Sequence, residues 1–153
     1  MISLTSEYAV RAAVYLARVQ QDRPNAYSGA RQIAAAAGVP GNYLGKILQQ
    51  LARTGILDSR KGSGGGFRLA RDPHSITLLD VVSPLEHNHR LGHCPMGQVC
   101  GESEQCTMHV TWQRLIGFYL QTLQSKTLGQ IAQVNGRAPT AKRRSRRAEL
   151  VRS

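Results

Sequence analysis

The segment from residue 41 to residue 71 constrains the fold most, because it joins a strongly amphipathic helical pattern to a glycine-rich hairpin pattern. In residues 41–54, apolar side chains recur at the spacing of one helical face, and polar side chains occupy the opposite face. The apolar stripe consists of Leu44, Ile47, Leu48 and Leu51. A shorter helix over 29–37 precedes it, and Gly38 followed by Pro40 ends that helix. Two helices joined by a short turn predict a helix-turn-helix.

A basic, glycine-rich stretch follows the second of these helices directly. The sequence ILDSRKGSGGGFRLAR places short apolar runs on either side of a loop of glycines and cations, which predicts a β-hairpin, or wing. Glycines let a backbone approach a phosphate or enter a narrow minor groove, and the basic side chains supply positive charge. A helix-turn-helix followed by such a wing favours nucleic-acid binding.

The candidate DNA contacts lie on the polar face of the helix and in the hairpin. Amide side chains can pair with adenine edges, and Lys or Arg can pair with guanine or phosphate. The candidates in the helix are Asn42, Tyr43, Lys46, Gln49, Gln50 and Arg53, and those in the hairpin are Arg60, Lys61, Gly64, Gly65 and Arg68. The alternatives are an amphipathic surface helix with a solvated hairpin, or a protein that binds nucleic acid without sequence preference.

Helical patterns also flank this region. Apolar residues at helical spacing predict a first helix over 5–19, and Ser28 is the expected N-cap of the next helix. Thr77, with Asp80 three residues later, is a capping signal for a helix over 77–85.

A long helix is predicted over 107–125, and Thr127 is the expected cap of a last short helix. One face of the long helix carries Trp112, Leu115, Ile116, Tyr119 and Leu123. These patterns together predict a mainly α fold with a small β-hairpin.

The net charge of +11 is concentrated in two places. Residues 31–71 hold seven Lys or Arg and only Asp58, and residues 134–153 hold seven Lys or Arg and only Glu149. A basic patch with a basic tail suits a polyanionic partner such as DNA. The tail has few large apolar residues, so we expect it to be disordered and to add non-specific DNA affinity.

The chain has three cysteines, Cys94, Cys100 and Cys106, at C-x5-C-x5-C spacing. No signal peptide, lipidation motif or apolar run of membrane-spanning length is recognisable, so we expect a cytoplasmic protein without membrane partners. Structural disulfides are rare in that compartment, and an odd cluster of cysteines favours a metal. Thiolates suit iron–sulfur clusters and zinc, and such sites usually take four ligands. A structural zinc site and a metal-free thiol redox switch are the alternatives.

Catalytic motifs are not recognisable in the sequence. It contains no P-loop, no G-x-S-x-G and no HExxH motif. Cys94 and the adjacent His93 could form a nucleophile pair, but no orienting partner is evident. We therefore expect a binding protein and not an enzyme.

The sequence GVPGNYLGKILQQLARTGILDSRKGSGGGFRLAR resembles the recognition helix and wing of the Rrf family of winged-helix transcriptional regulators. The similarity covers residues 1–133, from LTSEYAVRAAVYLA through ITLLDVV to the long helix. It implies a homodimer, joined through the long helix and bound to a partly palindromic operator, most simply as a repressor. The implied domains are a winged helix-turn-helix over 1–85, a cysteine-rich loop over 86–106, a dimerisation region over 107–133 and the tail over 134–153.

The resemblance also implies an iron–sulfur cluster that senses nitric oxide, redox state or iron–sulfur status. In IscR-like members, a histidine three residues after the last cysteine completes a 2Fe–2S site, and His109 stands there. In NsrR-like members, an acid on the first helix of the partner subunit completes a 4Fe–4S site, and Glu7 occupies the comparable place. The sequence offers a candidate fourth ligand for each cluster type and does not distinguish between them.

Overall fold

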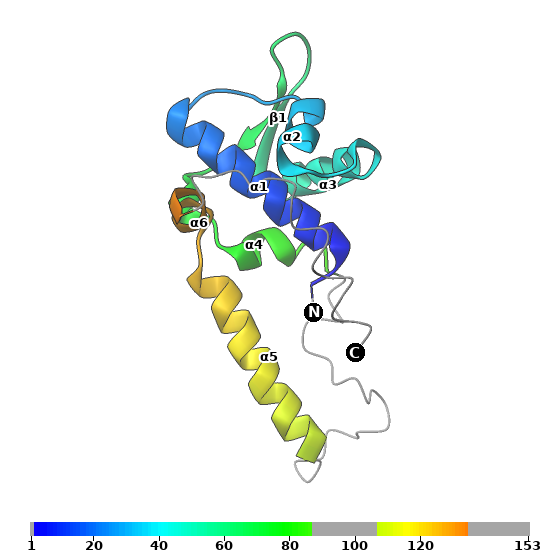
Figure 1. Cartoon of the computed structure of the whole chain (residues 1–153), viewed down its shortest axis with the longest axis vertical. Helices are drawn as coiled ribbons and strands as arrows, with labels where there is room; N and C mark the ends of the chain where they lie inside the picture. Colours follow the sequence, from blue (N-terminus) through cyan, green and yellow to red (C-terminus); the bar gives the residue numbers. More distant parts are fainter. Residues whose placement is uncertain (1, 87–106, 135–153) are drawn as a thin grey trace, which may run out of the picture.

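The computed structural model describes residues 2–86 and 107–134, and it confirms a mainly helical winged-helix fold with one small hairpin (Figure 1). The elements are α1 (Leu4–Asp22), α2 (Ala30–Ala37), α3 (Gly41–Arg53), β1 (Leu57–Arg60), β2 (Gly66–Leu69), the 3-10 turn η1 (Pro73–Ser75), α4 (Leu78–Val82), α5 (Thr107–Ser125) and α6 (Leu128–Val134). None of the helices in these ranges is long and apolar enough to cross a bilayer.

Helix α1 packs against both helices of the helix-turn-helix. It spans Leu4–Asp22 and is therefore longer than the predicted 5–19. Ser3 caps it, and the Ser3 hydroxyl accepts a hydrogen bond from the backbone N–H of Ser6 at 3.2 Å. The helix ends at Asp22 because Pro24 disfavours helical dihedrals at the residue before it, and Arg23 has left them. Small and aliphatic side chains fill its inner face, namely Ala9, Ala12, Ala13, Leu16 and Ala17. Their size lets α2, α3 and α6 pack closely against α1.

Helices α2 and α3 form the predicted helix-turn-helix. Gly38 ends α2 with a φ of 65°, a left-handed conformation that glycine adopts at low cost. The predicted apolar stripe of α3 is confirmed, because Leu44, Ile47, Leu48 and Leu51 are all buried. The polar face of α3 is therefore turned away from the core.

The predicted N-cap role of Ser28 is wrong. Gly29 is the N-cap of α2, and no side chain caps this helix. Ser28 is extended and buried, and its backbone exchanges two hydrogen bonds of 2.9 Å with Phe67 of β2. This pairing attaches the wing to the start of α2, which the local sequence pattern does not reveal.

The wing is the antiparallel pair β1–β2, in register from Leu57 opposite Leu69 to Arg60 opposite Gly66. Gly66 has a φ of 137°, and a Cβ atom there would lie 2.3 Å from the Ser28 carbonyl oxygen. The close approach of β2 to Ser28 therefore requires glycine at this position.

Helix α4 has the predicted capping box but is shorter than the predicted 77–85. The Thr77 N–H donates to the Asp80 carboxylate at 2.9 Å, and the Asp80 N–H donates to the Thr77 hydroxyl at 3.1 Å. The helix ends at Val82, where Pro84 follows closely and limits continuation. The chain then turns to Glu86, the last residue described before the cysteine segment.

Helix α5 extends away from the other elements, whereas α6 returns to lie against α1 (Figure 1). Leu128 and Ala132 of α6 join the core of the winged-helix unit. Two backbone hydrogen bonds of 2.9 Å hold the junction between α5 and α6 in place. The Leu78 N–H donates to the Lys126 carbonyl, and the Leu128 N–H donates to the Ile76 carbonyl. The last part of the segment predicted over 107–133 is thus packed into the N-terminal unit.

Candidate nucleic-acid interface

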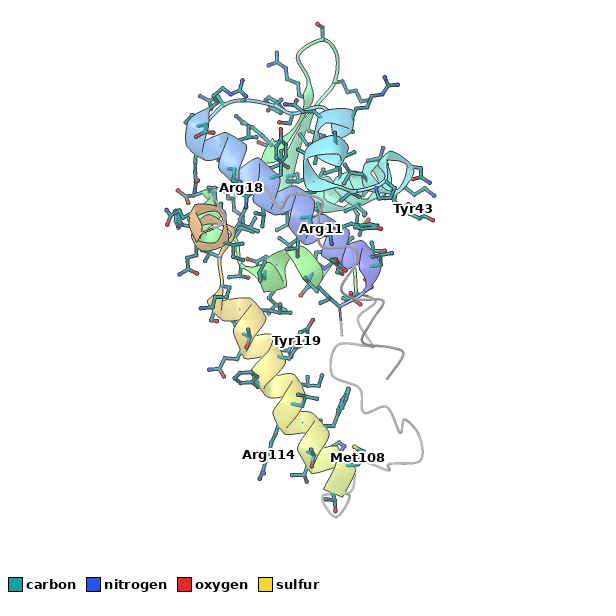
Figure 2. The ribbon with its side chains drawn as sticks, viewed as in Figure 1. Arg11, Arg18, Tyr43, Met108, Arg114 and Tyr119 are labelled. Atoms are coloured by element: carbon teal, nitrogen blue, oxygen red, sulfur yellow. The ribbon has the colours of Figure 1, made fainter. Side chains whose placement is uncertain are left out.

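The structure places the predicted contacts of α3 on one solvent-facing side of the helix. Asn42, Tyr43, Lys46, Gln49 and Arg53 are exposed, and Gln50 is half-buried. Tyr43 is 60 % exposed on α3 (Figure 2). A large aromatic side chain at this exposure, among amides and cations, suits contact with bases or phosphates rather than packing.

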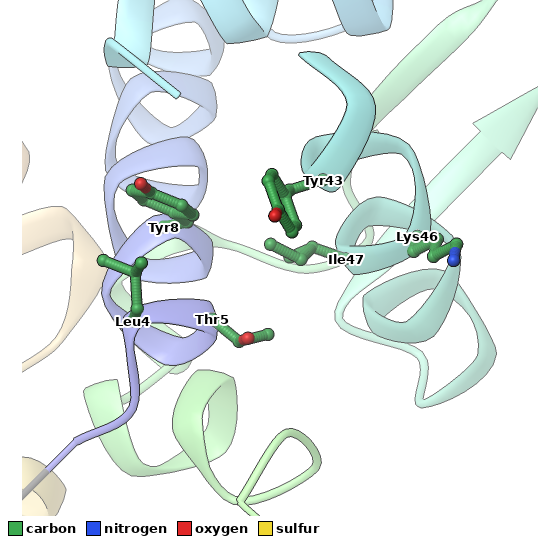
Figure 3. Close-up of a pocket in the computed structure, with 6 residues that line it drawn as sticks. All are labelled: Leu4, Thr5, Tyr8, Tyr43, Lys46 and Ile47. Carbon is green, nitrogen blue, oxygen red and sulfur yellow. The ribbon is translucent and has the colours of Figure 1, made fainter. Parts of the chain in front are cut away.

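A cavity of about 250 Å³ separates this edge of α3 from the first turns of α1 (Figure 3). Its lining consists of Leu4, Thr5 and Tyr8 of α1 and Tyr43, Lys46 and Ile47 of α3. The Tyr8 and Tyr43 side chains lie on opposite sides of the space. The first turns of α1 therefore border two candidate DNA contacts, which the sequence patterns did not reveal.

The wing tip presents the predicted cations and glycines. Arg60, Lys61 and Gly64 are exposed. Gly62 and Gly64 have φ values of 91° and 73°, which other residues rarely adopt. A Cβ atom at Gly65 would lie 2.2 Å from the Arg60 carbonyl oxygen. The predicted contact residue Gly65 thus also has a steric role in folding the tip.

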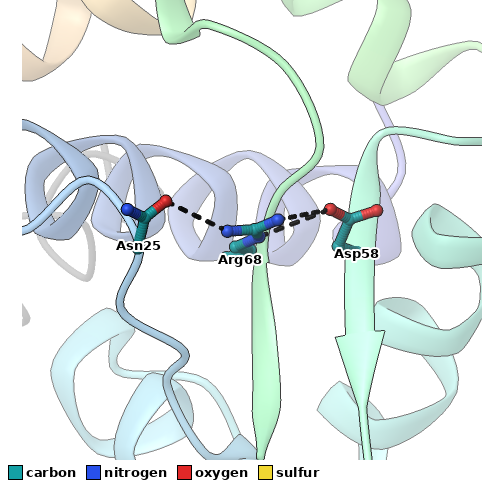
Figure 4. A network of polar contacts seen from close by, with 3 residues as sticks. All are labelled: Asn25, Asp58 and Arg68. Carbon is teal, nitrogen blue, oxygen red and sulfur yellow. Dashed lines mark hydrogen bonds and ion pairs between the residues drawn. The ribbon is translucent and has the colours of Figure 1, made fainter.

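Arg68 differs from the other cations of the wing, because it lies in a polar network at the base of the hairpin (Figure 4). Its Nε and Nη2 donate to Asp58 Oδ2 at 3.3 and 3.2 Å, and its Nη1 donates to Asn25 Oδ1 at 3.4 Å. The guanidinium carbon lies 4.9 Å from the centre of the Tyr27 ring. These contacts connect the wing to the segment between α1 and α2.

Glu86 is a functional candidate that sequence reasoning missed. Its carboxylate is buried and accepts hydrogen bonds from the backbone N–H of Ser3 at 2.7 Å and from the Ser6 hydroxyl at 2.6 Å. Burial alone would raise the pKa of Glu86, but the hydrogen bonds from Ser6 and Ser3 outweigh it and hold the pKa below its ordinary value. No local pattern signals this residue, because its partners are 80 and 83 positions away.

The candidate metal ligands are only partly within the described residues. Cys94, Cys100 and Cys106 lie outside them. His109 is half-buried in the first turn of α5, and Glu7 is half-buried in the first turn of α1, where it forms an ion pair with Arg11. Within residues 2–86 and 107–134, no three His, Cys, Asp or Glu side chains gather as a metal site.

The chain matches a protein-family model, Rrf2, described as "Iron-dependent Transcriptional regulator", over residues 2–134. This chain belongs to the Rrf2 family. The match covers every described element and confirms the resemblance noted in the sequence. Rrf2 proteins are transcriptional regulators, so the chain is a DNA-binding regulator and not an enzyme.

Curated Rrf2 relatives agree with this assignment. The chain is 31 % identical to the HTH-type transcriptional regulator NsrR of Bacillus subtilis (strain 168) over 126 residues, which cover 80 % of the chain and 84 % of NsrR. It is 29 % identical to the HTH-type transcriptional regulator IscR of Vibrio campbellii over 136 residues, which cover 88 % of the chain and 79 % of IscR.

Solved structures agree on the fold. The structure named T. potens IscR superposes with a TM-score of 0.72 at 23 % identity and covers 93 % of each chain. At this identity the likeness establishes the Rrf2 winged-helix fold alone.

Proposed function

We propose that this Rrf2 protein is a sequence-specific repressor that binds its operator through α3 and the wing. The observation that carries the proposal is the solvent-facing set of amides and cations on α3, next to the wing cations, on a helix whose other face is fully buried. In this arrangement α3 enters the major groove, where Gln49 and Asn42 read adenine edges. Arg60 and Lys61 reach phosphates or the adjacent minor groove.

Arg68 has a structural role in the wing, unlike these cations, which contact DNA. Its guanidinium already donates to Asp58 and Asn25, and it stacks on Tyr27. A planar fork held by two partners fixes direction better than a flexible ammonium does. Arg68 therefore orients the hairpin relative to α2 and α3, while the tip residues contact DNA.

Two copies of the chain form the DNA-binding unit, and α5 supplies the contact between them. Leu115 and Phe118 are 45 % and 72 % exposed on α5, and Met108 and Val110 are exposed near its start. Exposed apolar residues gathered on one long helix are typical of a surface that another chain covers. A two-fold dimer presents two recognition helices to half-sites about one DNA turn, or ~34 Å, apart.

An iron–sulfur cluster held by Cys94, Cys100 and Cys106 sets the DNA affinity of this dimer. Three thiolates fit such a cluster, and the fourth ligand is His109 or Glu7 of the partner subunit. For Glu7 this requires release from Arg11, whereas His109 lies in the first turn of α5, three residues after Cys106 in the sequence. When bound, the cluster supplies a centre that reacts with nitric oxide or oxygen. Zinc, or a cysteine pair without metal, is the alternative.

The positions of the two ends of the cysteine segment support coupling between the cysteines and DNA. The cysteine segment connects Glu86, next to the N-terminus of α1, with Thr107 at the start of α5. A change in this segment can alter both the DNA-binding unit and the helix that joins the two copies. A ten-thousandfold change in affinity requires about 5.5 kcal/mol of differential stabilisation between two states.

The test of the cofactor is an absorption spectrum with iron, sulfide and zinc analysis on protein purified without oxygen. We expect a coloured protein that contains iron and sulfide, and a Cys100→Ala variant that lacks the colour. Colourless protein with stoichiometric zinc would replace the cluster by a structural site. Colourless, metal-free protein that takes up no iron on reconstitution would leave the thiol switch.

The test of sequence specificity is selection of binding sites from random DNA, followed by footprinting. The proposal predicts a partly palindromic site with two protected half-sites. Uniform protection without a preferred sequence would instead favour the alternative, a basic protein that binds nucleic acid non-specifically through its patch and tail.

A further inference from the structure

We infer that Glu86 is a positioning residue for DNA binding, because its carboxylate fixes the first turn of α1, which in turn borders the recognition helix α3. This inference rests on the proposed function in one respect, namely that α3 reads the operator. It assigns Glu86 no contact with DNA and no ligand role.

The carboxylate of Glu86 holds the start of α1 through hydrogen bonds from Ser3 and Ser6, and we call this contact the clasp. Glu86 is 8 % exposed, and Ser6 is fully buried. One carboxylate oxygen accepts both the Ser3 N–H at 2.7 Å and the Ser6 hydroxyl at 2.6 Å. Hydrogen bonds to an ionised carboxylate are about twice as strong as neutral ones, and a negative charge at a helix N-terminus is favourable. The clasp therefore fixes both the position and the start of α1.

The packing beyond this clasp does not fix the first turns of α1 in the same way. Leu4, Thr5 and Tyr8 line the cavity of about 250 Å³ on the side of α1, and Tyr43, Lys46 and Ile47 line it on the side of α3 (Figure 3). Protein interiors are normally close-packed, and close packing holds neighbouring helices in register. Where packing is open, directional hydrogen bonds must hold the turn in place. Loss of the clasp thus frees the turn whose side chains line the cavity beside Tyr43 and Lys46.

Glu86 also joins the start of α1 to the residues that precede the cysteine segment. It is the last described residue before the cysteine segment, and it is bonded to the N-terminus of α1. The negative charge of Glu86, after burial, also contributes to raising the pKa of Tyr119 on α5. Glu86 therefore connects the residue before segment 87–106 with the first turn of α1, which borders α3.

The experiment compares Glu86→Gln, Glu86→Ala and Ser6→Ala with a matched control, Asp80→Ala. Asp80 is also a carboxylate that caps a helix, but it caps α4, and its hydrogen bonds are with Thr77 and not with the start of α1. For each full-length variant we would measure affinity for the selected operator and for scrambled DNA, at a temperature where circular dichroism shows it folded. Hydrogen exchange over residues 3–8 and 41–47 is measured on the same samples without DNA.

We expect Glu86→Ala to weaken operator binding on the order of tenfold, the size that changes along a coupled network produce, with little change on scrambled DNA. Exchange should accelerate at both 3–8 and 41–47. Glu86→Gln keeps an acceptor oxygen and should recover most of the affinity, and Ser6→Ala should fall between the two. Asp80→Ala should lower the melting temperature without changing the ratio of operator to scrambled affinity.

Two results would overturn the inference. One is an unchanged affinity ratio in Ser6→Ala and both Glu86 variants. The other is acceleration of exchange at 3–8 that leaves 41–47 unaffected, because α1 would then loosen without reaching α3. If the wild-type protein prefers no DNA sequence, the proposed function fails. The exchange measurement still decides the link between Glu86 and α3, because it requires no operator.

Discussion

At the scale of single residues, Arg68 and Lys61 represent two different roles of a cation in the wing, namely structural support and contact with DNA. Arg68 donates to Asp58 and Asn25, whereas Lys61 is exposed at the tip. We predict that Arg68→Gln weakens operator binding without changing the slope of log affinity against log salt, because it removes a support and no interaction with a phosphate. Lys61→Gln should lower that slope by about one.

The measurement for this pair is a fluorescence anisotropy titration of operator DNA at several salt concentrations. Equal reductions in slope for Arg68→Gln and Lys61→Gln would place Arg68 on the DNA backbone. The positioning role of Arg68 would then be wrong.

The carboxyl of Glu86 makes a second prediction, on pH. Its pKa in the folded protein is held below the ordinary value of 4.5 by hydrogen bonds from Ser6 and Ser3, which outweigh the effect of burial. A depressed pKa stabilises the fold above pH 4.5, and this contribution is lost as the pH falls below that value towards the folded pKa. Wild-type protein should therefore lose more stability than Glu86→Gln between pH 6 and about pH 3. Urea midpoints of both proteins across this range would test it, and parallel losses would contradict it.

Single residues also show what the sequence could and could not predict. The exposed amides and cations of α3 could be predicted from helical periodicity. Once the apolar face is assigned to the core, the polar residues on the opposite face must point to solvent. Ser28 was misassigned as an N-cap because its partner, Phe67, lies in a distant strand. Glu86 was missed for the same reason, since its hydrogen-bond partners belong to the start of the chain.

At the scale of elements, the wing depends on one close approach between β2 and the residue before α2. Gly66 combines a φ of 137° with a position where a Cβ atom would lie 2.3 Å from the Ser28 carbonyl oxygen. We predict that Gly66→Ala lowers the free energy of unfolding by about 1–3 kcal/mol or more and weakens operator binding, because β2 must move away from Ser28.

Gly29→Ala is the matched control, because a Cβ atom at Gly29 would meet nothing within 4 Å. This substitution should change the free energy of unfolding by less than about 1 kcal/mol. Chemical denaturation of both variants would test the pair. Equal losses of unfolding free energy in the two variants would mean that the pairing of Ser28 with Phe67 contributes little to stability.

The predictability of each element depends on the range of the contacts that define it. The helix α3 and the wing were readable because each has a strong local pattern. The end of α4 depends on Pro84 and was placed three residues too late, at Leu85, whereas the helix ends at Val82. The docking of α6 on α1 was not predicted, because it depends on Leu128 and Ala132 meeting residues more than a hundred positions earlier.

At the scale of the whole molecule, positive charge is divided between the DNA-binding unit and the C-terminal tail. Residues 134–153 contain seven Lys or Arg and one Glu. We predict that removal of residues 135–153 weakens binding to operator and to scrambled DNA by the same factor, because the tail supplies charge and not base recognition. The salt slope should fall by about 0.9 for each DNA phosphate that the tail neutralises in the full-length protein. An unchanged slope in the truncated protein would exclude the tail from the DNA complex.

We propose a division of labour within the molecule. In this proposal the unit of α1–α4, α6 and the wing binds the operator, α5 joins two copies, and the cysteine segment between α4 and α5 controls the affinity. The most direct test is the ratio of operator to scrambled-DNA affinity for wild-type protein purified without oxygen, compared with Cys100→Ala. The account predicts that the two ratios differ by at least about fivefold, the lower end of typical allosteric couplings. Equal ratios would contradict it, because the cysteines would then exert no control over operator binding.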